Sequence, residues 1–175
     1  YKNGHISEAT NSALQIATGE FIVLVDNDDE LALNALYEVA KILQDHRDLD
    51  VIYSDEDKID ENGNRTNPYF KPDYCPDTLL SYNYISHMGV YRRTLIEQIG
   101  GFRKGVEGSQ DYDLLLRVIE LTENIYHIPK ILYHWRAISG STALDGAEKS
   151  YAYIAGKKAL EDTVKRRKYN AEVKY

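Results

Sequence analysis

The sequence predicts an α/β domain in which a mostly parallel sheet is flanked by helices. An uninterrupted apolar stretch at residues 21–25 is typical of a strand that is buried on both faces. Apolar residues then recur at helical spacing between residues 33 and 43, and a second short strand follows at residues 50–55. A strand, a helix and a strand in succession indicate a right-handed crossover unit.

The N-terminal elements follow this pattern in order. Ser7 can cap a helix that ends at Gly19, and this helix is the expected crossover of an earlier unit, so we expect the sheet to begin before residue 1. The segment at residues 30–46 is expected to be the next helix. Its predicted apolar face consists of Leu33, Leu36, Val39, Ala40 and Leu43.

The chain after residue 55 is richer in turns. Residues 56–77 include Asn62-Gly63, a type I′ hairpin signal, and three of the four prolines, so we expect an excursion over the surface. The other expected elements are a short helix from residue 77, a strand at 88–91, a helix ending at Gly100-Gly101, a helix within 108–122, a strand at 125–136 broken by Pro129, and a helix at 147–167.

Composition narrows the class of protein. The 175 residues include 28 Asp+Glu and 21 Lys+Arg, and the formal charge of -7 argues against nucleic acid or an anionic membrane as a general partner. Cys75 is the only cysteine, which excludes an internal disulfide and a thiolate zinc site. No apolar run is long enough to span a bilayer. The chain opens at Tyr1 with no leader pattern, which indicates a piece of a longer protein.

The stretch EFIVLVDNDDEL, residues 20–31, places Asp26, Asp28 and Asp29 directly after the first strand. Ligands of open α/β sheets collect at the carboxyl ends of strands. Asp26 and Asp28 alternate along extended chain, so both can point into the same cleft. A hard divalent cation such as Mn²⁺ or Mg²⁺ neutralises such a pair well. The alternative is that Asp28 or Asp29 only caps the helix that follows.

Two other acidic motifs were compared with this stretch. A calcium-binding loop starting at Asp26 requires Gly and Glu where the chain has Leu31 and Tyr37, so it is excluded. A phosphatase of the haloacid-dehalogenase type also places D-x-D after a buried strand, but it prefers Thr or Val at the position of Glu30. This phosphatase stays open as an alternative, as does a catalytically silent carbohydrate-binding or assembly module.

Several segments together resemble the GT-A glycosyltransferases of family 2, particularly bacterial members that extend cell-surface polysaccharides. The segments that carry the resemblance are residues 3–31, YSDEDKID (53–60), FKPDY (70–74), GGFRKGVEGSQDYDLLLR (100–117) and HIPKILYHWR (127–136). The resemblance spans residues 3–143 and implies a GT-A (Rossmann-like) fold. It also implies inverting transfer of a sugar from a nucleotide-diphosphate donor to an acceptor hydroxyl, with Mn²⁺ or Mg²⁺ as cofactor.

On the donor side, the resemblance implies that Asp28 coordinates the metal on the diphosphate. Asp26 is expected to bind the donor ribose or to support the metal through water. His134, in YHWR, matches a position that completes the metal site in some relatives, although a lone His is also often structural. Arg136 is suited to forked contacts with donor phosphate.

On the acceptor side, Asp111 matches the general base that takes the proton from the acceptor hydroxyl; the alternative is that it only caps its helix. Gln110 stands where many relatives have Glu, which bears on acceptor contacts. His87 falls in the segment that forms the acceptor half. Asp55, from the acidic run 55–57, is a further candidate for contact with acceptor hydroxyls, and a solvated loop is the alternative for this run.

The resemblance also implies a division of the chain. Residues 1–55 would be the remainder of the donor and metal half, residues 56–143 the acceptor and catalytic half, and residues 144–175 a C-terminal helix. Relatives open with nucleotide-binding turns that would precede Tyr1, so we expect weak or no transfer by this chain alone. The exposed edge of an incomplete sheet favours a homodimer. A saccharide or lipid-linked saccharide is the expected acceptor, and the cytoplasm, at the inner face of the membrane, the expected location.

Overall fold

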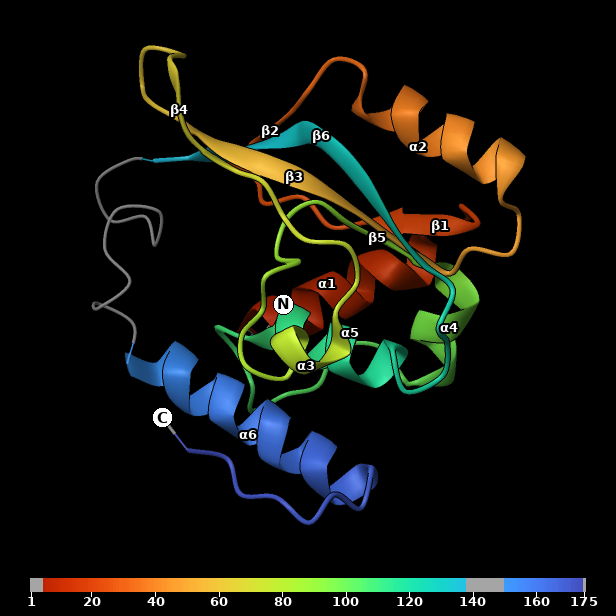
Figure 1. Cartoon of the computed structure of the whole chain (residues 1–175), viewed down its shortest axis with the longest axis vertical. Helices are drawn as coiled ribbons and strands as arrows, with labels where there is room; N and C mark the ends of the chain where they lie inside the picture. Colours follow the sequence, from red (N-terminus) through yellow and green to blue (C-terminus); the bar gives the residue numbers. More distant parts are fainter. Residues whose placement is uncertain (1–4, 138–149, 175) are drawn as a thin grey trace. The chain divides into compact units, whose positions relative to one another are not determined.

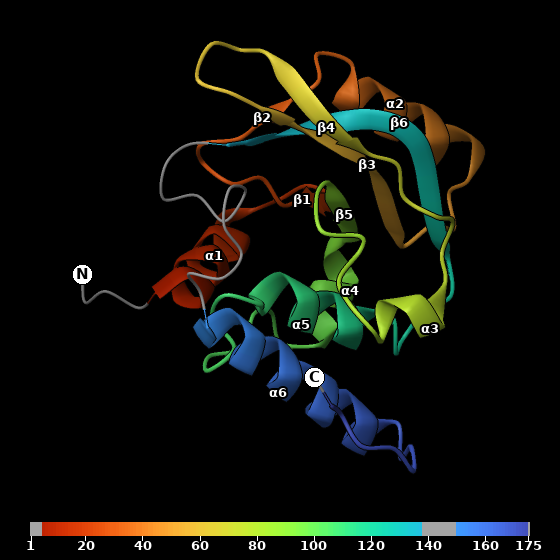
Figure 2. The same cartoon turned by 60° about the vertical axis from the view of Figure 1, so that its left-hand side comes forward.

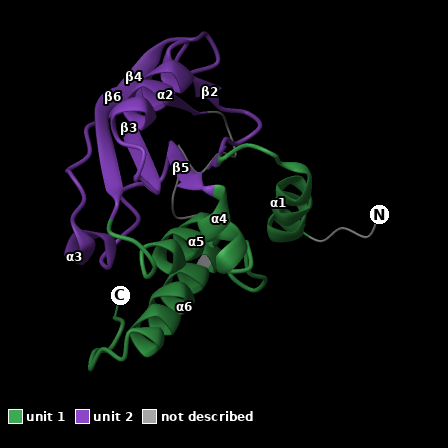
Figure 3. Cartoon of the chain, turned by 90° about the vertical axis from the view of Figure 1, so that its right-hand side faces the viewer, with its two compact units in different colours: residues 1–20, 93–123, 149–175 green, residues 21–92, 124–148 purple. Residues whose placement is uncertain are grey.

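A computed structural model describes residues 5–137 and 150–174 of the chain (Figure 1). The chain forms two compact units, each assembled from separate stretches of sequence (Figure 3). The sheet unit comprises residues 21–92 and 124–148, and the helical unit comprises residues 1–20, 93–123 and 149–175. Among the described residues, no helix is both long and apolar enough to cross a membrane.

The sheet unit is built on one mixed sheet with the strand order β1-β5-β3-β6-β2, and β4 pairs with β3. The strands are β1 (Phe21–Val23), β2 (Glu30–Leu31), β3 (Val51–Ile59), β4 (Arg65–Tyr69), β5 (Gly89–Arg92) and β6 (Ile125–Arg136). β3 and β6 are parallel, and the other pairs of described strands are antiparallel. The expected α/β class is confirmed. Because β5 lies between β1 and β3, those two strands share a direction without pairing.

The first strand is less buried than its apolar sequence suggests. Phe21–Val23 is only half-buried along its length, where burial on both faces was expected. The reason is its position, since β1 stands at one end of the strand order and pairs only with β5 among the described strands.

Helix α2 (Ala35–Asp45) packs on the sheet, and the short helix α3 (Pro76–Leu79) follows β4 (Figure 1). Ala35 and Val39 are buried in the core of the sheet unit. Leu33 and Leu36, which were expected on the buried face, are exposed. The prediction was wrong at these two positions because Glu30–Leu31 forms β2 and the helix begins only at Ala35, whereas the expected burial of Val39 is confirmed.

Strand β3 continues through the acidic run and ends at Ile59, so the expected surface excursion begins later than residue 56 (Figure 2). Asp55, Glu56 and Asp57 are 3%, 7% and 4% exposed. The hairpin at Asn62-Gly63 is confirmed, with Gly63 at φ +80°. The turn is not type I′, because that type requires positive φ at both central residues and Asn62 lacks it.

Strand β6 is continuous across Pro129, where a break was expected. Ser54 pairs with Ile128 and Asp55 with Ile131, so the register between β3 and β6 shifts at the proline. Proline has no N–H to donate to the ladder, and a bulge accommodates it without ending the strand.

The helical unit contains α1 (His5–Ile16), α4 (Arg93–Gln98), α5 (Gln110–Val118) and α6 (Ser150–Arg166), which confirms the helices expected in these regions. Gly100 and Gly101 end α4 with φ of +77° and +73°, a conformation that favours glycine. Asn11 of α1 holds the next residue, because its side chain accepts from Phe102 N at 2.8 Å and donates to Phe102 O at 2.8 Å.

We predict that β1 mediates the homodimer expected from the sequence. A strand from a second copy could extend the sheet at its outer edge, where unpaired backbone groups act as a template. Light scattering after size exclusion should then give a mass that rises with concentration. Val23→Pro removes a backbone donor that points away from β5, since Leu24 N bonds to Gly89 O across the ladder and the N–H groups alternate in direction, so it should reduce the rise. A mass equal to one chain at every concentration would contradict the prediction.

Candidate metal and donor site

Three potential metal ligands converge just after β1. One carboxylate oxygen each from Asp26 and Asp29 and one imidazole nitrogen from His87 all lie within 4.8 Å of one another. Over residues 5–137 and 150–174 this is the one group of three or more such side chains close enough to share an ion. We call these three residues the ligand group.

Asp29 is held by two donors from β6. The Tyr133 hydroxyl donates to Asp29 Oδ2, and the Arg136 backbone N–H donates to Oδ1 at 2.8 Å. Burial nevertheless raises the pKa of the Asp29 carboxyl. Asp29 therefore does not cap the following helix, which was the alternative considered from sequence. Asn34 occupies the N-cap position of α2.

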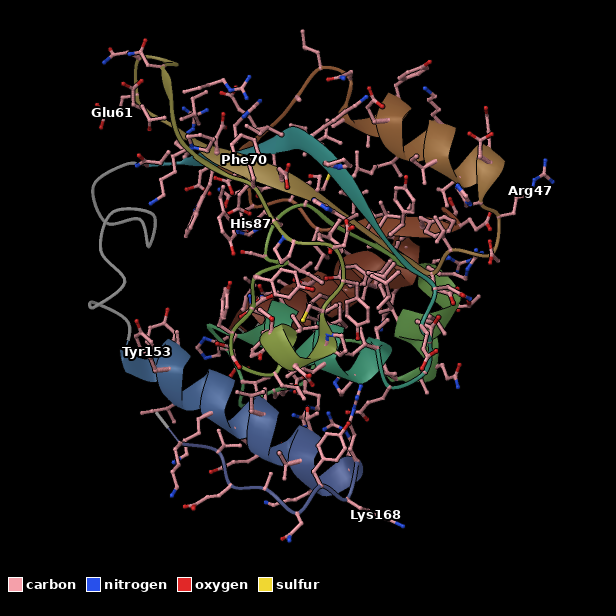
Figure 4. The ribbon with its side chains drawn as sticks, viewed as in Figure 1. Arg47, Glu61, Phe70, His87, Tyr153 and Lys168 are labelled. Atoms are coloured by element: carbon pink, nitrogen blue, oxygen red, sulfur yellow. The ribbon has the colours of Figure 1, made fainter. Side chains whose placement is uncertain are left out.

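Tyr133 contacts every member of the ligand group. Besides its bond to Asp29, its hydroxyl accepts from Asp26 N at 3.2 Å, and its ring stacks on His87 with centroids 4.6 Å apart. Trp135 of β6 meets the His87 ring edge-on, with centroids 5.6 Å apart. Figure 4 labels His87 near strands β3 and β6. Burial, followed by the bond to Asp29, raises the pKa of Tyr133, so the hydroxyl remains a donor at neutral pH.

His134 lies on the opposite face of the sheet from His87. Side chains alternate along a strand, and the neighbours Tyr133 and Trp135 both face His87. His134 Nδ1 is instead 2.6 Å from Asp57 Oδ1, and Asp57 also accepts from Arg65. The structure therefore does not bring His134 together with the carboxylates that follow β1.

The side chain of Arg136 bonds the backbone of Asp28. The Asp28 side chain is exposed and lies outside the ligand group, while its carbonyl oxygen accepts from Arg136 Nε at 2.6 Å. Arg136 also pairs with the Glu30 carboxylate. Arg136 thus holds the loop that carries the carboxylates.

Asp55 is buried and fully engaged within the sheet unit. Its Oδ1 accepts from Lys71 N at 2.9 Å and lies 2.9 Å from His127 Nε2. His127 Nδ1 in turn lies 3.1 Å from Asp73. The acidic run is therefore not the solvated loop considered from sequence, and Asp55 ties β3 to β6 and to the segment after β4.

Asp111 and Gln110 begin helix α5 of the helical unit. Asp111 is half-buried, and Gln110 Oε1 accepts from Gly108 N at 2.7 Å. The N-cap residue Ser109 does not cap the helix, because its hydroxyl donates to Ala152 O at 2.8 Å. Leu114, Leu115 and Val118, which lie three, four and seven residues after Asp111, are buried.

Sequence analysis missed Tyr133 and the ligand role open to Asp29. The signal was present in the alternation of YHWR, because a strand that presents Tyr133 and Trp135 to one face must present His134 to the other. Assigning His134 to the metal site from the resemblance overlooked this consequence.

Comparison with solved structures defines the class of protein. The chain superposes on S. aureus TarS 1-349 in complex with UDP-GlcNAc with a TM-score of 0.67 and 19% identity, covering 98% of this chain and 49% of that one. The mannosyltransferase PcManGT from Pyrobaculum calidifontis, in complex with GDP-Man and Mn²⁺, gives a TM-score of 0.55 and 16% identity over 97% of this chain and 56% of that one. The fold is therefore that of a GT-A glycosyltransferase.

Sequence comparison places the chain more narrowly. The profile of Glycosyl transferase family 2 matches residues 2–100, and the chain belongs to this family. It is 49% identical over 166 residues to the uncharacterized protein y4gI of Sinorhizobium fredii and 40% identical over 170 residues to the O-antigen biosynthesis protein RfbC of Myxococcus xanthus. These matches cover 94% and 97% of this chain but only 18% and 13% of the two relatives.

Proposed function

We propose that this glycosyltransferase chain binds a nucleotide-diphosphate sugar together with Mn²⁺ or Mg²⁺ and transfers the sugar, with inversion, to a saccharide hydroxyl in polysaccharide synthesis. The observation that carries the proposal is the ligand group, which stands at the end of β1 in a chain of family 2. A lipid-linked acceptor at the inner face of the membrane and a cytoplasmic location are part of the same proposal.

The chemistry of the ligand group suits such a cation. Carboxylate oxygens are the ligands that Mg²⁺ and Mn²⁺ prefer, and imidazole is also a ligand for transition metals such as Mn²⁺. Burial raises the pKa of Asp29 despite its two hydrogen bonds, and a cation beside the carboxylate would act in the opposite direction. A bound cation would neutralise charge on the departing diphosphate.

The acid–base work falls to Asp111. Its carboxylate would take the proton from the acceptor hydroxyl as the acceptor oxygen bonds to the anomeric carbon. The bond from that carbon to the diphosphate oxygen breaks, and the electron pair leaves with the nucleoside diphosphate. Gln110 would contact the acceptor beside Asp111. Similar relatives support the substrate classes, since the matched TarS structure holds UDP-GlcNAc and RfbC is an O-antigen biosynthesis protein.

We predict that His87→Ala and Asp29→Asn each weaken Mn²⁺ binding by about 10-fold or more, because each removes an atom of the ligand group. Calorimetric titration with Mn²⁺, alone and with UDP or GDP, measures the effect. The matched control for His87→Ala is His134→Ala, which lies on the opposite face of the sheet, and the control for Asp29→Asn is Asp28→Asn, which lies in the same loop after β1. Both controls should bind Mn²⁺ nearly as the wild type does.

If His134→Ala and Asp28→Asn weaken Mn²⁺ binding more than His87→Ala and Asp29→Asn do, the metal is held by Asp28 and His134, as the resemblance implies. If the wild-type chain binds neither Mn²⁺ nor a nucleoside diphosphate, the proposed function fails. Metal-free binding of an oligosaccharide would then favour a silent carbohydrate-binding module.

A further inference from the structure

A buried ion pair lies next to the ligand group. Lys71, in the FKPDY segment, has a side chain with 0% exposure, and its Nζ lies 2.9 Å from Oε2 of Glu56 on β3. Burial lowers the pKa of Lys71, and the Glu56 carboxylate offsets part of this effect. Neither residue belongs to the ligand group or to the proposed chemistry.

The pair holds the peptide groups on both sides of the His87 side chain. Glu56 Oε2 accepts from His87 N at 3.2 Å, and Lys71 Nζ donates to His87 O. Lys71 Nζ also donates to Ile85 O at 2.6 Å. The ammonium group therefore has three acceptors and the His87 backbone is fixed at both its N–H and its carbonyl oxygen.

Such a pair is a poor choice for stability alone. Removing two charges from water costs free energy, and the attraction between the charges often does no more than offset this cost. A pair of apolar residues of similar size frequently gives equal or greater stability. The imidazole ring of His87 is contacted by the stacked Tyr133 ring and by the edge-on Trp135 ring. Neither aromatic contact constrains the His87 backbone. The hydrogen bonds from Glu56 and Lys71 supply that second constraint.

We propose that Glu56 and Lys71 form a buried clamp that positions His87 for cation binding. They are positioning residues that act through His87, and this inference rests on the proposed function of the ligand group. Outer partners that orient a metal ligand typically contribute about 10- to 100-fold to metal affinity.

The test replaces the clamp by apolar side chains in the double variant Glu56→Leu/Lys71→Met. The variant should still fold, since no unpaired charge is left behind. A moderate loss of stability is expected, because Ile85 O and the His87 backbone lose their hydrogen-bond partners. Its Mn²⁺ affinity, measured by calorimetry on the whole chain, should fall about 10- to 100-fold. Amide hydrogen exchange without metal should be faster at His87, because its N–H loses the Glu56 acceptor.

Asp50→Asn is the matched control. Asp50 pairs with Arg92 at 2.8 Å and ties β3 to β5 away from His87, so its loss should lower stability and leave Mn²⁺ affinity and His87 exchange unchanged. Glu56→Gln, which keeps the shape of the side chain, serves if the double variant does not fold. It should weaken Mn²⁺ binding and speed exchange at His87 to a smaller degree than the double variant.

The outcomes separate the clamp from the proposed function. A folded double variant, or Glu56→Gln in its place, with wild-type Mn²⁺ affinity and wild-type exchange at His87 overturns the clamp. Absence of Mn²⁺ binding by the wild type overturns the metal site, and exchange at His87 in the metal-free chain then still decides whether the pair fixes the backbone. If the Asp50→Asn control also loses Mn²⁺ affinity, the effect of the double variant reflects a general loss of stability, and the inference is overturned.

Discussion

Asp113→Asn is expected to lower the free energy of unfolding by about 3 kcal/mol, because it removes the negative charge from a buried ion network. The Asp113 side chain has 0% exposure and accepts from Arg117 Nε at 2.8 Å. It also pairs with Arg103, which in turn lies 3.0 Å from Asp162 of α6. Urea unfolding followed by circular dichroism measures the change.

The size of the effect follows from what the charge holds together. Arg117 also donates to Ile99 O at 3.0 Å and Gly101 O at 2.7 Å, so the network joins the end of α4 to α5 and α6. Hydrogen bonding to Asp113 raises the pKa of Arg103, whereas burial lowers that of Arg117. Asparagine would leave both guanidinium groups without the carboxylate that offsets their desolvation.

Glu97→Ala is the matched control in the same unit. Glu97 forms an exposed i,i+4 pair with Arg93, and such pairs contribute only about 0.3–0.5 kcal/mol. Similar losses of stability in the two variants would show that Asp113 is no more important than a surface charge.

Local patterns predicted most of the helices. Helices α5 and α6 have apolar positions at helical spacing, and α4 ends at paired glycines that adopt positive φ. These signals are carried by neighbouring residues, so one sequence is sufficient to read them. The start of α2 was misplaced because β2 forms by pairing with β6, a contact with residues about a hundred positions away that no local pattern reports.

The acidic part of β3 could not be predicted for the same reason. Asp55, Glu56 and Asp57 have low strand propensity and look solvated in sequence. In the structure each is paired: Asp55 with His127, Glu56 with Lys71, and Asp57 with Arg65 and His134. Burial of a charge depends on a partner supplied by another element, and only the fold shows which partner is present.

The sequence located a candidate site at the carboxylates after β1 and included Asp26. It named His87 only as an acceptor-binding residue, not as a metal ligand. The choice between Asp28 and Asp29 depends on contacts from Tyr133 and Arg136 across the sheet. In an extended chain, side chains alternate between two faces, and this pattern favoured Asp28 as the partner of Asp26. The chain instead turns after β1, and this turn directs Asp29 toward β6.

Asp111→Asn is expected to lower the rate of sugar transfer by about 10²- to 10⁴-fold, the usual contribution of a general base. Asparagine has nearly the same shape but cannot take the proton from the acceptor hydroxyl. Transfer from a radiolabelled nucleotide sugar to a saccharide acceptor gives the rate, measured in the longer protein because weak or no transfer is expected of this chain alone, and Mn²⁺ titration of the same variant should match the wild type. The helix dipole contributes about 0.3–1 kcal/mol of stability through an acidic residue in the first turn, and Asp111→Asn should lose this contribution.

Glu107→Gln distinguishes a base from a charge near the start of α5. Glu107 lies in the loop before the helix, and its carboxylate accepts from Gly105 N at 2.9 Å. Its replacement removes the same charge without removing the proposed base, so transfer should proceed at close to the wild-type rate. If Asp111→Asn instead lowers stability by several kcal/mol and keeps the wild-type rate per folded molecule, Asp111 is a structural residue of α5 and the base lies elsewhere. A carboxylate that only stabilises the helix acts through the folded fraction, whereas a base acts on the rate of each folded molecule, and the two measurements together separate these effects.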